Sequence, residues 1–189
     1  MSFAAAKGQR QTAEDWAWGQ IRTGQVADFN AKCGRQLDPK EAEGWADSCR
    51  EITARFVQLV LTDAKRQAAV PHHFVVIEGA HITGTVDLGG FDITDTVGIG
   101  SSRIEGEIIL DDSRWTRVLS LDGSAVTGNL RAQRMRSLSA VYLRNVAISG
   151  YTVLLCSPFQ VAGVENLRLP FWRFLRSIAA AEQSRRHGH

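Results

Sequence analysis

Residues 97–121 read VGIGSSRIEGEIILDDSRWTRVLSL, and this stretch decides the fold. Pairs of apolar residues separated by one position recur in it at a constant spacing, from 97 to 108 and from 108 to 119. The pairs are Val97/Ile99, Ile108/Leu110 and Leu119/Leu121. Side chains at positions i and i+2 lie on the same face of a strand. The stretch therefore predicts very short strands, each with one buried face, at a fixed spacing along the chain.

The same period continues on both sides of this stretch. Further pairs are Val75/Ile77, Val86/Leu88, Leu130/Ala132 and Val141/Leu143. A second, mostly large apolar series interleaves at the same spacing: Ile82, Ile93, Ile104, Trp115, Val126, Ser137, Ile148 and Phe159. Glycines recur at twice the period, at positions 84, 106, 128 and 150. The complete repeat therefore has the length of the interval between two of these glycines, and it consists of two similar halves.

A strand of three or four residues is not stable alone, but it becomes stable when like strands stack about 4.8 Å apart. A coil with four short sides and the length of this repeat stacks Ile77, Ile99, Leu121 and Leu143 into one column. The recurring glycine falls at a corner, where a positive φ or a close backbone approach is needed. We predict a mainly β fold, a β-solenoid of about four coils over residues 74–160.

Small residues precede the large ones by two positions, as in Ala80/Ile82, Ser102/Ile104, Ser113/Trp115 and Ser124/Val126. This alternation, found within residues 74–160, resembles the pentapeptide-repeat proteins. The resemblance implies a right-handed four-sided β-helix with a small inward position and a large central one. An unrelated solenoid with a coil of the same length is the alternative, because the spacing itself does not fix the handedness.

Residues 1–73 are predicted to form a helical N-terminal capping region. Thr12 and Asp15 form a capping pair for a helix through Ile21, and residues 27–33 suit a second helical turn. The strongest helix is expected over 38–65, because Asp38, Pro39 and Glu41 are typical of a helix start. An apolar stripe follows: Ala42, Trp45, Cys49, Ile52, Phe56 and Leu59.

Residues 161–189 are predicted to form a C-terminal capping or dimerisation helix and a tail. Pro170 opens the helix, which places five large apolar residues at cap or dimer contacts: Phe171, Trp172, Phe174, Leu175 and Ile178. Pentapeptide-repeat proteins commonly dimerise through this end, so the resemblance implies a possible homodimer. Contact of the basic amphipathic helix with an anionic membrane is a less favoured interpretation.

Charge is distributed unevenly along the repeat. Residues 74–112 hold eight acids and one arginine, and residues 113–160 hold one acid and six arginines. The candidate interaction surface contains Asp87, Asp92, Glu105, Glu107, Asp111, Asp112, Arg114, Arg131, Arg134 and Arg136. Acidic pentapeptide-repeat rods mimic DNA and engage DNA gyrase, and this resemblance implies a similar role. The favoured interpretation is plainer: Asp112 lies below Arg134, and Asp92 below Arg114, as salt pairs between coils.

The sequence contains no motif that indicates an enzyme, a metal site or a cofactor. His72, His73 and His81 are expected at the surface or near the cap. Cys33, Cys49 and Cys156 are an odd number without CxxC spacing, so we expect reduced, buried cysteines and neither a disulfide nor zinc. The first residues lack an apolar stretch of signal-peptide length, so we expect a cytoplasmic protein. We also expect a bacterial source.

These observations predict a non-catalytic scaffold whose solenoid surface binds a protein partner. The reason is that the repeat is uninterrupted and has no inserted loop to build a pocket. The first alternative is a DNA mimic that inhibits or protects nucleic-acid machinery such as DNA gyrase. A β-helix enzyme is the least favoured alternative. We do not expect direct nucleic-acid binding, because the net charge is only +2 and the basic half has few aromatic residues.

Overall fold

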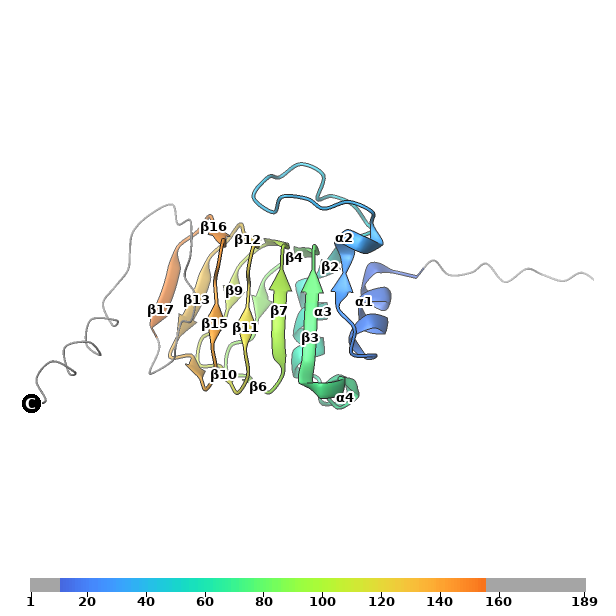
Figure 1. The fold of residues 1–189 in the computed structure, drawn as a ribbon. Coiled ribbons are helices and arrows are strands. Elements are labelled where there is room, and N and C mark those ends of the chain that lie inside the picture. The colour runs from blue at the N-terminus through green and yellow to red at the C-terminus, as the bar shows by residue number, and fades with distance from the viewer. Residues whose placement is uncertain (1–10, 156–189) are drawn as a thin grey trace, which may run out of the picture.

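The structure, a computed structural model, describes residues 11–155 as a parallel β-solenoid of about four coils (Figure 1). Its strands form four sheets, which we call faces A to D. Face A contains β1 (Ala27–Asp28), β3 (Phe74–Glu78), β7 (Thr96–Gly100), β11 (Leu119–Ser120) and β15 (Val141–Tyr142). Face B contains β2 (Glu51–Thr53), β4 (His81–Thr83), β8 (Arg103–Glu105), β12 (Ala125–Val126) and β16 (Ala147–Ile148). The four-sided, mainly β architecture predicted from the sequence is confirmed.

The two remaining faces complete each coil. Face C contains β5 (Val86–Asp87), β9 (Ile108–Ile109), β13 (Leu130–Gln133) and β17 (Thr152–Leu155). Face D contains β6 (Asp92–Ile93), β10 (Arg114–Trp115) and β14 (Arg136–Ser137). Every pairing within the repeat from Phe74 onward is parallel, and neighbouring coils keep one register, as in Ile77 with Ile99 and Trp115 with Ser137. The predicted columns of like side chains are therefore present.

The core consists of these inward columns. Ile82, Ile104, Val126 and Ile148 stack behind face B, and Ile52 of β2 extends the column toward the N-terminus. All five are almost completely buried. Each short strand thus gains its stability from the coils on either side of it, because a strand of this length buries too little surface by itself.

The corners explain the small residues and the glycines. The hydroxyl of Ser102 accepts a hydrogen bond from the Ala80 amide at 3.0 Å, and that of Ser124 accepts one from the Ser102 amide at 3.1 Å. At the corner between faces B and C, the Gly128 amide donates to the Gly106 carbonyl at 3.0 Å. A Cβ on Gly128 would lie only 2.5 Å from that oxygen. Glycine is therefore needed there for a close approach of two backbones.

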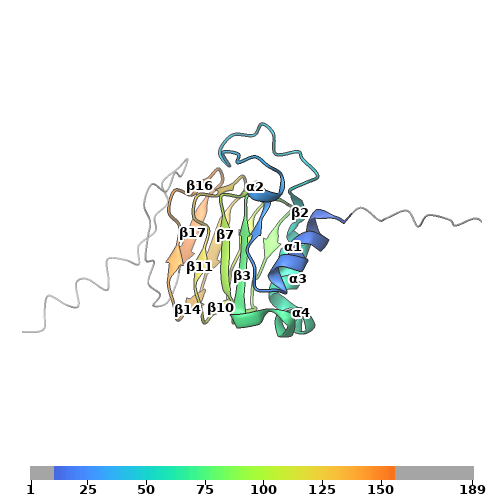
Figure 2. The same ribbon diagram turned by 45° about the vertical axis from the view of Figure 1, so that its right-hand side comes forward.

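Helices gather at the N-terminal end of the stack (Figure 1, Figure 2). They are α1 (Ala13–Ile21), α2 (Phe29–Lys32), α3 (Ala54–Thr62) and α4 (Ala64–Ala69), followed by a 3₁₀ turn at Pro71–His73. The predicted Thr12–Asp15 capping box opens α1, and α2 lies within the predicted second helical segment. Because β1 and β2 pair with β3 and β4, this region is itself an irregular first coil, in which α3 packs against β5.

The helix predicted over residues 38–65 is wrong in its first half. Residues 38–50 form a loop, β2 is extended, and α3 begins only after Thr53, whose hydroxyl accepts a hydrogen bond from the Phe56 amide at 3.1 Å. Pairing of Ile52 with Ile82 in the sheet outweighs the local helical pattern, because tertiary contacts decide between marginal local preferences. The predicted C-terminal helix and tail lie outside the described residues.

Candidate interaction surface and inserted loop

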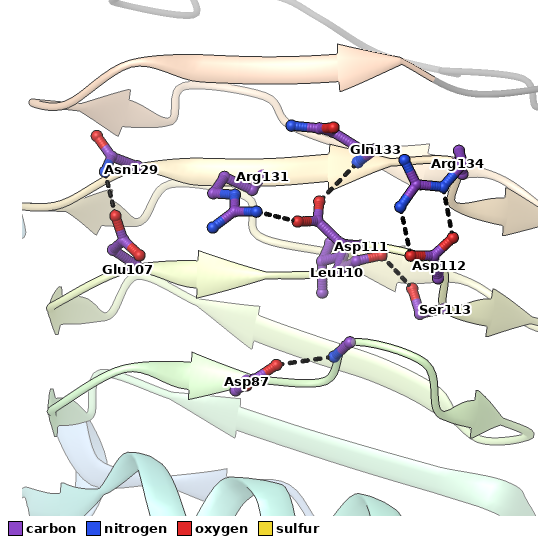
Figure 3. Close-up of polar contacts among 11 residues, drawn as sticks. Asp87, Glu107, Leu110, Asp111, Asp112, Ser113, Asn129, Arg131, Gln133 and Arg134 are labelled. Atoms are coloured by element: carbon purple, nitrogen blue, oxygen red, sulfur yellow. Dashed lines mark hydrogen bonds and ion pairs between the residues drawn. The ribbon is translucent and has the colours of Figure 1, made fainter.

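Acids of one coil lie beside arginines of the next coil on face C and at the corner between faces C and D (Figure 3). The Arg131 guanidinium is 2.5 Å from the Asp111 carboxylate, which also accepts a hydrogen bond from the Gln133 amide at 2.8 Å. Arg134 forms two hydrogen bonds of 2.6 Å with Asp112. These hydrogen bonds lower the pKa of Asp112. The predicted salt-pair columns are therefore present.

The other members of the predicted surface are spread over three faces. Asn129 donates to Glu107, and Asp87 accepts a hydrogen bond from the Gly89 amide at 2.9 Å (Figure 3). On face D, Arg114 is 3.2 Å from Asp92, and Arg136 stacks on Arg114. Among residues 11–155 no ion pair holds Arg136.

Glu105 lies apart from this surface, on face B. Partial burial disfavours its charge, but hydrogen bonds with His81 and Arg103 outweigh the burial, and the pKa of Glu105 is lowered. Four of the eight acids in the acidic half, Asp92, Glu105, Asp111 and Asp112, thus form ion pairs with arginines. A continuous strip of free carboxylates, which a DNA mimic needs, does not occur among the described residues of faces C and D.

We expect these pairs to contribute little stability, and unequally. Arg131→Met should lower the free energy of unfolding by about 1 kcal/mol, because Asp111 is mostly buried beside it. Arg134→Met should have a smaller effect, because this arginine and its partner Asp112 are both exposed. Urea denaturation of the two variants measures the difference. Equal losses of unfolding free energy in the two variants would contradict the expectation that the more buried pair contributes more stability.

An insertion interrupts the first, irregular coil between faces A and B. Ile77 and His81 are 4 positions apart, whereas their partners in the preceding coil, Ala27 and Glu51, are 24 positions apart. The additional residues include the 34–50 loop, which stands out from the stack (Figure 1). The described coils from Phe74 onward carry no such insertion, as predicted, and the inserted loop lies before them, in the region predicted as a helical cap.

A disulfide between Cys33 and Cys49 closes this loop. The expectation of reduced cysteines is wrong for this pair. Their sequence separation of 16, with turn-forming residues between them, is the signal in the sequence that points to a closed loop. The odd total of three cysteines obscured it. The third, Cys156, lies outside the described residues.

Buried side chains hold the loop against the solenoid. Trp45 is 1% exposed, and its ring packs edge-on against His81 with 6.4 Å between centroids. Arg50 is equally buried and donates to the carbonyls of Gly79 at 3.0 Å and Arg35 at 2.7 Å. Arg103 of face B donates to the Pro39 carbonyl at 2.9 Å. The loop therefore has a fixed position over the corner between faces A and B.

A hollow of about 460 Å³ opens between the loop and this corner. Residues 36–39 line one side, and Ser101 and Gly123, which occupy the corner in successive coils, line the other. Its volume is in the range of pockets that hold a small ligand or a side chain. Residues 36–39 belong to the predicted N-terminal capping region, so the hollow does not arise from the short loops of the predicted solenoid alone.

Glu78 lies beside this hollow and carries an unfavourable charge. Partial burial raises its pKa, and the carboxylates of Asp28 and Asp122 on the same face raise it further, although a hydrogen bond with Ser101 opposes the shift. The glycine at position 100 leaves the space into which Glu78 leans: a Cβ there would be 2.4 Å from the carboxylate. Asp122 itself is bound by Arg144 at 2.5 Å.

We expect Glu78→Gln to stabilise the protein at neutral pH by less than about 1 kcal/mol. The folded-state pKa is raised, so ionised Glu78 costs stability at neutral pH, and the cost disappears as the pH falls through the folded-state pKa. Urea denaturation at pH 7 and at pH 4 tests this. The free energy of unfolding of the variant should exceed that of the wild type at pH 7 and equal it at pH 4. A less stable variant at pH 7 would contradict it.

The histidines differ in their surroundings. His81 is buried beneath the loop, with Nε2 3.2 Å from the Glu105 carboxylate, so it does not lie at the surface. His73 is exposed and lies 3.1 Å from the buried Asp95 carboxylate. Within residues 11–155, no three metal-ligating side chains gather in one place. No helix in this part of the chain is both long and apolar enough to cross a membrane.

Comparison of the chain with models of protein families, with curated proteins and with solved structures yielded no significant match. Function is therefore inferred from the geometry described above. The predicted cap or dimer contacts, Phe171, Trp172, Phe174, Leu175 and Ile178, lie outside the described residues.

Proposed function

We propose that the protein is a non-catalytic scaffold that binds a protein partner at the inserted loop and the adjoining corner of the solenoid. The observation that carries the proposal is the 34–50 loop, which is closed by a disulfide and held by buried Trp45 and Arg50. In repeat proteins, insertions commonly lie on the binding face, and a rigid scaffold that positions a loop is typical of binding proteins. A preformed loop also lowers the entropy lost on binding.

Site-specific photo-crosslinking tests this proposal. A photoreactive amino acid at Gln36, in the loop, should give a discrete adduct of higher mass in extracts of the source organism. The control carries the same group at Thr116, which is exposed on face D. Adducts of equal yield from both positions, or none from Gln36, would exclude the loop as the binding surface.

The DNA-mimic alternative has less support, because Asp92, Asp111 and Asp112 are paired with arginines of the next coil. A gyrase supercoiling assay at micromolar protein, with and without a quinolone, tests it. The right-handed sense and membership of the pentapeptide-repeat class are further proposals that follow from the resemblance. The Cys33–Cys49 disulfide favours an oxidising compartment over the cytoplasm expected from the sequence.

A further inference from the structure

The rim of the hollow is rich in hydrogen-bond acceptors and in negative charge. Asp38 lines it directly, and the Glu78 carboxylate lies over Gly100, the residue before Ser101 of the lining. Glu78 is in register with Asp28 of β1, so two outward carboxylates are neighbours on face A. Among the described residues, no lysine or arginine forms an ion pair with Glu78.

Two arginines close to the hollow are already bound to other partners. Arg103 donates to the Pro39 carbonyl and forms an ion pair of 3.2 Å with Glu105. Arg144 forms hydrogen bonds of 2.9 Å and 2.5 Å with Asp122. Because these guanidinium groups face other acceptors, they do not neutralise Glu78. The carboxylates of Asp38 and Glu78 therefore make this side of the hollow complementary to a cation.

Side chains of β3 fill the space above two glycines of face A beside the hollow: Val76 lies over Gly98, and Glu78 lies over Gly100. The outward positions of β7 include Gly98 and Gly100, and the equivalent of Gly98 in the next coil is Ser120. No described helix or loop covers these strands, which lie side by side in Figure 1. An extended chain can therefore lie on face A while one of its side chains enters the hollow.

We propose that the hollow binds a lysine or arginine side chain on an extended segment of the partner protein, with Glu78 as its counter-charge. This inference rests on the proposed function and adds the chemistry of the partner. A cation beside Glu78 would favour the ionised carboxylate, which its carboxylate neighbours now disfavour. The protein's own net charge of +2 makes non-specific attraction of a basic peptide a weak competitor.

Fluorescence anisotropy with a fluorescein-labelled tetralysine peptide tests the proposal. The intact disulfide-bonded protein should bind tetralysine and not a tetraglutamate peptide at about 0.15 M salt, where long-range attraction is screened. Glu78→Gln should weaken binding about tenfold, because it removes the counter-charge. The matched control is Asp87→Asn, which removes an exposed carboxylate on face C and should leave the affinity within about twofold.

A second measurement on the wild-type protein locates the peptide. The amide resonances of Ser101 and Gly123 should shift on titration with tetralysine, and that of Gly89 on face C should not. Absence of tetralysine binding, or equal affinity of Glu78→Gln and wild type, would overturn the inference. A Gln36 crosslink that persists in either case would leave the scaffold proposal standing, so the two failures can be told apart.

Discussion

Gly128→Ala is expected to lower the free energy of unfolding by about 3 kcal/mol, close to the limit for overpacking a close-packed site. The added Cβ would lie 2.5 Å from the carbonyl oxygen of Gly106 and 2.6 Å from its carbonyl carbon. Both atoms belong to the backbone of the preceding coil, so no side-chain rotation relieves the clash. The φ of Gly128 is not in the left-handed region, so alanine causes no backbone strain there. The loss of stability therefore measures the close approach of the two backbones alone.

Urea denaturation measures this effect, and the matched control is Gly19→Ala. Gly19 lies within α1, and a Cβ there meets nothing within 4 Å. The control should be neutral or should stabilise by up to about 1 kcal/mol, because alanine is the better helix former. If both substitutions had the same effect, the two backbones would be able to move apart at no cost, and the glycine column would have no structural role.

Removal of the Cys33–Cys49 disulfide by the double substitution Cys33→Ala and Cys49→Ala should lower the free energy of unfolding by about 3 kcal/mol. The cross-link closes a segment with a sequence separation of 16, and a loop of about this length accounts for a loss of this size in the unfolded-chain model. The loop should also become sensitive to proteases between positions 36 and 48, because exposed loop tips are preferred cleavage sites.

Reducing agent provides the control for this prediction. The wild-type protein in dithiothreitol should behave like the double variant, and the double variant should not respond to dithiothreitol. Thiol titration of the unfolded wild type should rise by two groups on reduction. A wild-type protein whose stability and protease resistance do not change on reduction would show that Trp45 and Arg50 alone hold the loop.

The periodic part of the fold could be predicted because each position in it has one dominant requirement. Ile77, Ile99 and Leu121 must be apolar to fill one column, and Gly106 and Gly128 must lack a side chain. Requirements that return in every coil leave a pattern in a single sequence. The ion pairs followed from the same spacing, as in Asp112 with Arg134.

The candidate site could not be predicted, because it depends on contacts that do not repeat. Trp45 and Cys49 fit the apolar stripe of a helix, but Trp45 packs on His81 and Cys49 is bonded to Cys33. The strand at residues 51–53 needs β4 as a partner, and a local pattern does not reveal a partner so distant in the chain. The hollow arises only when Ser101 and Gly123 from two later coils meet residues 36–39.

The constant register between coils also restricts how the length of this rod can change. Deletion of residues 100–121, one complete coil, would join position 99 to position 122 and bring Asp92 opposite Arg136, so both the core columns and an ion pair would be preserved. Deletion of only half a coil would instead rotate every later strand to the opposite face and move the glycine column to the opposite corner. The molecule can therefore grow or shrink only in whole-coil steps.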